Sequence, residues 1–140
     1  MANTQAISGI MKQVALGAVV DGKTLKAALY LASATTNGTN TAYTATGEVS
    51  GTNYSAGGVS VTNANSAGLT STTAYWTPSA SIAFTTVTLS TAFDAVMIYS
   101  TTDSNRNLGV YTFGSQTITA GTFTLTMPTN DSSTGLILFA

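Results

Sequence analysis

Histidine and cysteine are both missing from this 140-residue sequence, and each absence narrows the chemistry that the chain can perform. Without histidine the protein lacks the commonest general base, the usual partner of a serine nucleophile and the commonest metal ligand. Without cysteine it can form neither disulfides nor thiolate metal sites, and redox chemistry says nothing of its compartment. We therefore expect a protein that is not an enzyme, with no catalytic residues, no cofactor and no metal site.

Charged residues are scarce as well. Four basic and five acidic side chains give a net charge of -1, and charged residues make up 6% of the chain, against about 25% in an average soluble protein. So weak a field does not gather polyanions, and we expect no nucleic-acid partner. No apolar run approaches the ~18 residues of a membrane span, and we expect no membrane partner. Neutral polar groups must cover the surface, which leaves little repulsion between copies and favours assembly.

The acidic residues form no recognisable catalytic or metal-binding motif. They are single and far apart in sequence, at Asp21, Glu48, Asp94, Asp103 and Asp131. Two carboxylates could still meet in the folded chain, as in glycosidases, but the turn-like context of these acids argues against it. The segment Asp103–Gly109 begins like a calcium-binding loop, yet Leu108 stands where that loop needs glycine. A tight connection between two strands explains the segment better.

From Gly22 onward, short β-branched and aromatic runs alternate with Gly, Asn, Ser and Thr, as in a β-sandwich or barrel. The expected strands are Thr24–Ala32, Gly58–Asn63, Thr72–Trp76, Ser81–Val87, Phe93–Ser100, Leu108–Phe113, Thr122–Met127 and Gly135–Ala140. Among them Ala95–Tyr99 is apolar without alternation, which predicts a central strand covered on both faces. About eight strands predict an all-β, antiparallel sandwich. We prefer a jelly roll to an immunoglobulin-like fold because the Cys-Trp-Cys spacing is missing.

The first 22 residues follow a different period. Apolar side chains recur at i, i+3, i+4 and i+7, at Ile7, Ile10, Met11 and Val14, which is one face of a helix. The turn Asp21-Gly22 ends this segment. Two interpretations stay open: an N-terminal arm (residues 1–22), part helical or extended, that docks on a neighbouring molecule, or a first strand and a short helix packed on the core of the sandwich domain (residues 23–140).

Residues 33 to 57 form the longest stretch without a clear strand, and loops of more than about 12–15 residues in compact domains are usually functional or disordered. An edge strand over Ala42–Val49 is an alternative interpretation, and its bare edge would invite a partner chain. Aromatic side chains beside loops can bury the ring against a partner and keep the polar tip bonded. Our candidate partner contacts are therefore Tyr43, Tyr54, Tyr75 and Trp76, together with Ile7, Ile10, Met11 and Val14. The five phenylalanines are expected in the core.

The segments Leu29–Ala34, Thr41–Tyr43 and Glu48–Val59, followed by the strand Val96–Ser100, the turn Asn105–Asn107 and an apolar C-terminal strand, resemble small virion proteins of tailed bacteriophages. In size, neutrality and β content the chain is most like the capsid cement or decoration proteins, several of which are jelly rolls that assemble as dimers or trimers.

The resemblance implies a non-enzymatic protein, made in the host cytoplasm and located on the capsid surface of the virion. It also implies two partners, the major capsid protein and further copies of the chain in a homodimer or homotrimer. The alternative is a tail-fibre or receptor-binding module that recognises bacterial surface sugars through its aromatic loops. A glycosidase-like enzyme is a third hypothesis.

Overall fold

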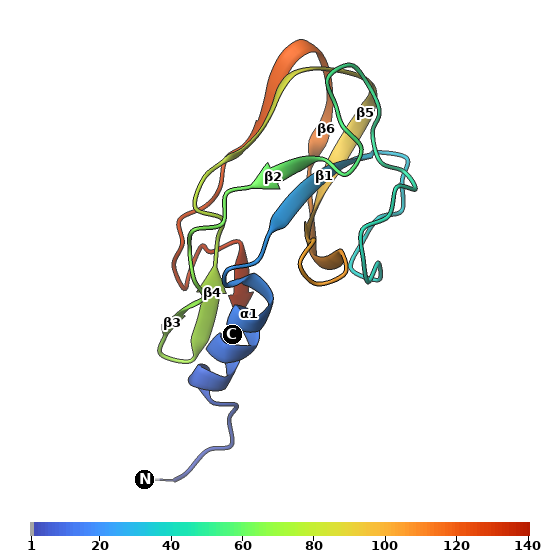
Figure 1. The fold of residues 1–140 in the computed structure, drawn as a ribbon. Helices are drawn as coiled ribbons and strands as arrows, with labels where there is room; N and C mark the ends of the chain where they lie inside the picture. The colour runs from blue at the N-terminus through green and yellow to red at the C-terminus, as the bar shows by residue number, and fades with distance from the viewer. Residues whose placement is uncertain (1) are drawn as a thin grey trace.

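The computed structural model describes residues 2–140 and confirms a mostly β chain with antiparallel sheets. Helix α1 (Gly9–Val20) comes first, and seven strands follow within these residues (Figure 1). They are β1 (Leu25–Leu31), β2 (Val59–Val61), β3 (Gly68–Thr70), β4 (Thr73–Trp76), β5 (Ile82–Ser100), β6 (Arg106–Leu125) and β7 (Ile137–Phe139). One sheet has the order β2-β1-β5-β6 and the other the order β3-β4-β7.

The predicted count of eight strands and the jelly-roll topology are not confirmed. The two predicted strands at residues 81–87 and 93–100 are one strand, β5, and those at 108–113 and 122–127 are one strand, β6. β5 and β6 stay paired with several register shifts between Phe84 and Ala95, and positive φ angles at Thr86 and Ala120 fall in the same region. Bulges bend a strand without ending it, so Gly and Thr residues that suggested breaks mark bends instead. Neither sheet closes on itself.

Both faces of the four-stranded sheet are covered. On one face Leu25, Ala27 and Leu29 of β1 join the main core, which also holds Trp76 and Phe84.

The opposite face carries a smaller core built on Ala28, Tyr30, Met97 and Tyr99, with Tyr43 and Ala34 packed against it. All residues from Ala95 to Ser100 are buried, which confirms the predicted central strand. The segment between β1 and β2 therefore covers a sheet face, and its backbone is held in place by that packing.

The segment from Ala42 to Val49 is not a strand; its backbone pairs with the sheet only at isolated bridges. Glu48 pairs with Tyr30, and Ala42 pairs with Arg106. Farther along the chain, directly before β2, Gly58 has a φ of +74° and lies against the backbone of β1, where a Cβ would collide with the carbonyl oxygen of Ala27. Glycine is required there by both conformation and space. The loop between β1 and β2 is thus held beside β1, next to the residues of β1 that pair with β2.

Helix α1 packs on the three-stranded sheet of its own chain, at the end of the molecule where the C-terminus also lies (Figure 1). Leu16 and Val20 are buried and belong to the main core. Gly9 allows close approach, because a Cβ there would come within 2.6 Å of the carbonyl oxygen of Ser71. The helix packed on the core, as in the second of our two interpretations, is therefore present, whereas residues 2–8 form no first strand. The predicted boundary between residues 1–22 and 23–140 lies at the turn Asp21-Gly22, directly after the helix. Met1 lies outside the described residues.

Candidate functional site

The outer face of α1 is apolar and open to solvent. Its large side chains are exposed by about half or more: Ile7 54%, Ile10 58%, Met11 51% and Val14 65%. These are the residues of the predicted helical face, with Ile7 just before the helix begins. The side of α1 that packs on the sheet carries other residues, namely Lys12, Leu16 and Val20. The helix is therefore apolar on two opposite sides, which is typical of a helix buried all round.

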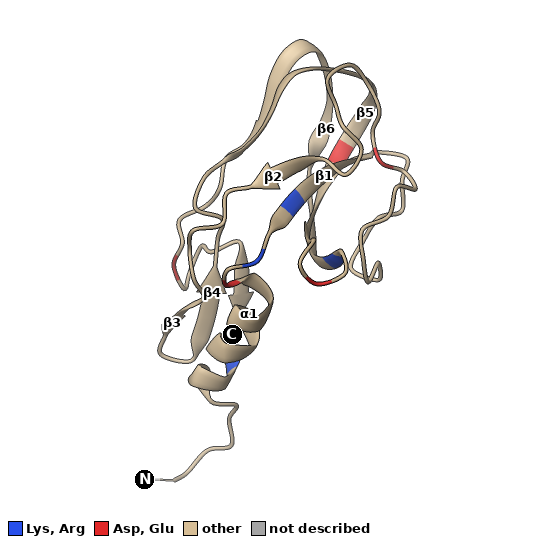
Figure 2. Ribbon diagram, viewed as in Figure 1, with Lys and Arg blue, Asp and Glu red and all other residues tan. Residues whose placement is uncertain are grey.

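A solvated surface helix turns its charged side chains outward, whereas α1 turns its charged side chain inward and apolar side chains outward. Its sequence contains one charged residue, Lys12, which is only 8% exposed and donates a hydrogen bond from Nζ to the Thr72 carbonyl oxygen at 3.1 Å. Figure 2 shows how few charged positions the chain has and how they are scattered over the other elements. An uncharged, apolar outward face of this kind is a candidate surface for contact with another molecule.

Two residues of β7, at the same end of the molecule, are exposed as well. Leu138 and Phe139 are exposed, and β7 contacts α1. Among residues 2–140, the exposed large apolar side chains all lie in α1, in the segment just before it, or in β7. The prediction that Phe139 is a core residue is therefore wrong, because β7 is the last strand of its sheet and pairs only with β4. Leu138 pairs with Tyr75 and Phe139 with Ala74, so their side chains point to opposite faces of the sheet. Hereafter the apolar end means the four exposed residues at α1, namely Ile7, Ile10, Met11 and Val14.

The predicted contacts Tyr43 and Tyr54 are brought together by one carboxylate. Tyr43 donates its hydroxyl to Glu48 Oε2 at 2.6 Å, and Tyr54 donates to Oε1 at 2.8 Å. The backbone N–H of Gly57 donates to the same Oε1 at 2.7 Å. The Tyr43 ring stacks on Tyr99 with ring centroids 4.8 Å apart. Both hydroxyls are thus engaged inside the chain, so this cluster ties the loop down.

The other two aromatic candidates lie in β4. Trp76 is 0% exposed and donates from Nε1 to the Asn65 carbonyl oxygen at 3.2 Å, so its prediction as a partner contact is wrong. We predicted Trp76 as a contact because it lies beside a loop. Side chains alternate between the two faces of β4, however, and that of Trp76 points into the core. Tyr75 faces the other way, is partly buried and covers Gly68. Sequence reasoning also missed Glu48, whose only signal was a lone glutamate between two tyrosines.

The buried tyrosines predict a loss of stability at alkaline pH. Burial raises the pKa of Tyr30 from 10.0 to about 12, and it raises the pKa values of Tyr43, Tyr54 and Tyr99, with the charge of Glu48 adding to the shift. Tyrosines of the unfolded chain release protons near pH 10. Stability should therefore be full below about pH 10 and should fall as the pH rises toward 12, by about 1.4 kcal/mol per pH unit for each tyrosine that stays protonated in the fold.

Urea unfolding followed by far-ultraviolet circular dichroism between about pH 8 and 11 would measure this fall. An unfolding midpoint that stays constant up to about pH 11 would show that the tyrosine hydroxyls ionise as freely in the fold as in the unfolded chain.

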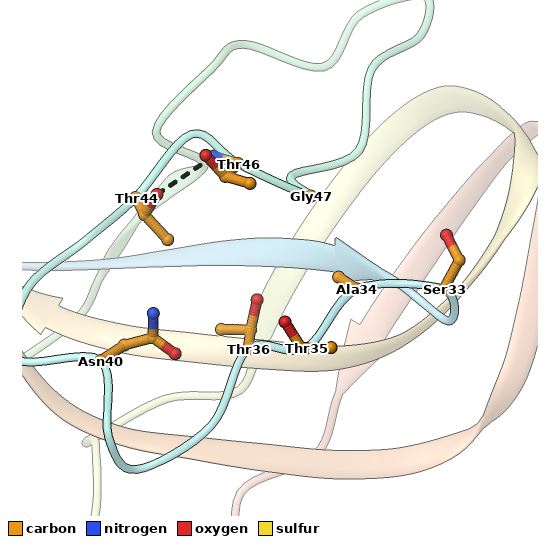
Figure 3. A pocket seen from close by; sticks show the side chains of 8 residues that line it. All are labelled: Ser33, Ala34, Thr35, Thr36, Asn40, Thr44, Thr46 and Gly47. Atoms are coloured by element: carbon orange, nitrogen blue, oxygen red, sulfur yellow. Dashed lines mark hydrogen bonds between the residues drawn. The ribbon is translucent and has the colours of Figure 1, made fainter.

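A hollow of about 490 Å³ lies beside this cluster, between the end of β1 and the loop. Hydroxyl groups line most of it, as the side chains of Ser33, Thr35, Thr36, Thr44 and Thr46 show (Figure 3). The Thr46 N–H donates to Thr44 Oγ1 at 3.1 Å, which shapes the rim. The lining side chains are uncharged. Such a hollow can exchange hydrogen bonds with a neutral, hydroxyl-rich ligand, but it offers no acid or base.

Other kinds of site are not seen in the part of the chain that the structure describes. Residues 2–140 bring together no group of three His, Cys, Asp or Glu residues that could hold a metal ion. Over the same residues, no helix has both the length and the apolar character needed to cross a membrane. The apolar end and the hydroxyl-lined hollow are therefore the two candidate sites. Comparison of the chain with protein-family models, with curated proteins and with solved structures gave no match.

Proposed function

We propose that this protein is a structural component of a bacteriophage particle, a capsid cement protein that binds over junctions between capsid subunits and stabilises the shell by non-covalent contacts. The observation that carries the proposal is the apolar end, with the only charge of α1 turned inward. The bacteriophage setting rests on the sequence resemblance. A surface built for protein contact on a nearly neutral chain supports a role in assembly.

Binding by such a protein need not be tight at any one place. Burial of apolar surface contributes roughly 25 cal/mol per Å², and an oligomer that touches several capsid subunits gains effective concentration from its own linkage. The tethered loop also supports the proposal, because a surface whose backbone is already ordered loses less entropy on binding. On this basis the shell gains many modest contacts, one for each copy.

Binding to the particle should be insensitive to salt. Of the four basic side chains, Lys12 is buried and Lys23 is paired with Asp103 at 3.1 Å. Few charges are left to pair with a partner, and salt screens only charge pairs. Sedimentation of particles with purified protein should give the same bound fraction from about 0.05 to about 0.5 M NaCl, with hundreds of copies per particle.

The proposal fails if modest salt strips the folded protein from particles, or if stained gels show only a few copies. The control for folding is the circular dichroism spectrum of the released protein, because binding lost through unfolding would not test the contact.

A second function is favoured by the hydroxyl-lined hollow: a module that recognises neutral bacterial surface sugars. The stacking rings expected for sugar binding are turned inward, with Tyr43 lying on Tyr99, so the hollow offers hydrogen bonds and little apolar contact. Titration calorimetry with purified cell-surface polysaccharide would separate the two functions. Saturable binding that Thr36→Val weakens would favour the sugar module, and its absence would leave the cement protein.

A further inference from the structure

We infer that the outer face of α1 is covered by the same face of a second copy of this chain, so that two α1 helices pack against each other. The inference rests on the proposed function only in requiring that α1 be covered by a protein. It deepens that function by naming the partner that covers the helix. The cement role would then belong to the paired molecule.

The spacing of the exposed side chains fits a helix pair. Ile10 and Met11 lie one turn before Val14 on one face of α1, the spacing that forms the seam between two packed helices, and Ile7 lies just before the helix begins. Ala18, also exposed, continues the stripe by another turn with a small side chain, which lets two helices approach closely. Leu16 and Val20 occupy the opposite side and are already used by the core. One helix can therefore satisfy its own sheet and a partner together.

The charges favour a self-complementary contact. In a twofold pair each residue faces a copy of its own surface, so any charge on the stripe would meet a like charge. The stripe has none, because Lys12 points into the chain and donates to Thr72. A net charge of -1 adds little repulsion between whole molecules. A contact with a charged partner would instead need complementary charges on this face, and α1 offers none.

The helix stripe alone offers less area than a complete interface. With half or more of each side chain exposed, the four residues of the apolar end offer roughly 450 Å² per copy, against about 600 Å² per partner in the smallest stable complexes. Residues 2–8 lie just before α1, are exposed and project beyond the body (Figure 1). In a pair they would lie next to the partner and add to this area.

Cross-linking tests the inference directly, because the natural chain contains no cysteine. Val14→Cys should be joined into a covalent dimer by a short bismaleimide, whose reach tolerates differences in register between the two helices. Thr117→Cys, an exposed position on β6 away from the stripe, is the matched control and should stay monomeric. Equal cross-linking of the two variants, or none of Val14→Cys, would overturn the inference.

Ultracentrifugation provides the second measurement. The natural protein should sediment as a dimer at micromolar concentration, and Val14→Glu should weaken association at least tenfold, while Thr117→Glu should leave it unchanged. Val14 is 65% exposed, so the thermal melt of Val14→Glu should match that of the natural protein.

A strict monomer whose binding to particles is abolished by Val14→Glu would overturn the helix pair and leave the cement proposal intact, with a capsid subunit on the stripe. A dimer through α1 that binds no particle would do the opposite.

Discussion

Replacing Trp76 by alanine is expected to lower the free energy of unfolding by about 3–5 kcal/mol, the usual cost of removing a buried aromatic side chain. Trp76 is fully buried in the core that also holds Leu16 and Val20 of α1, so the cavity would lie where the helix joins the small sheet. Collapse around that cavity is limited because β4 lies between two other strands of its sheet. Since single domains are stable by only about 5–15 kcal/mol, a large part of the total would be lost.

Calorimetry or urea unfolding followed by circular dichroism measures this loss, because the variant has no other tryptophan to report by fluorescence. Trp76→Phe is the matched control. It keeps most of the ring volume and loses the hydrogen bond to Asn65, so it should cost about 1–2 kcal/mol. If Trp76→Ala instead kept full stability and weakened assembly, Trp76 would be a partner contact after all.

Sequence patterns predicted those helices and strands whose hydrophobic period is clear or whose pairing strands lie nearby in the sequence. The expected strand Thr24–Ala32 matches β1 (Leu25–Leu31) closely, because its alternating side chains fill two cores. The break expected within β5 was wrong. The Thr-rich sequence there suggested a loop, but in the structure it accompanies register shifts within a continuous strand. β3 was missed because the three residues Gly68–Thr70 are too few to give a pattern, and only their pairing with β4 defines the strand.

Sequence patterns also failed to predict parts of the two candidate sites. The helical period before Asp21 identified the exposed residues of α1, but it gave no sign that Leu16 and Val20 would bury the opposite side. Both sides are apolar, and periodicity describes a helix with one apolar face. The Glu48 cluster could not be foreseen either. Its members gather only because the loop pairs with the backbone of β1 at the bridge between Tyr30 and Glu48.

Replacing Glu48 by alanine is the second change for which we expect a large effect, a loss of about 3 kcal/mol in the free energy of unfolding. Three donors point at this carboxylate, from Tyr43, Tyr54 and the backbone of Gly57. Hydrogen bonds to a charged group contribute about 1.5–3 kcal/mol each. Because Glu48 is only partly buried, water would satisfy some of these donors and reduce the loss below their sum.

The cost should spread from the carboxylate into the sheet. Tyr54 accepts the N–H of Leu29 at 3.0 Å while it donates to Glu48, so one chain of hydrogen bonds joins the loop to β1. Without the acceptor, the loop should open before the rest of the fold. Hydrogen exchange should then become at least tenfold faster at Gly57 and Tyr43 than in the natural protein, while Val96 and Ile98 keep most of their protection.

Glu48→Gln is the matched control because it keeps one acceptor oxygen in nearly the same place. That oxygen can accept from Tyr54 and Gly57, and the amide N–H can donate to the Tyr43 hydroxyl in place of the lost acceptor. The expected loss is about 1 kcal/mol, the difference between charged and neutral hydrogen bonds. If the alanine variant were as stable as the glutamine variant and its loop exchanged no faster, the carboxylate would not hold the loop. The stacking of Tyr43 on Tyr99 would then have to do so alone.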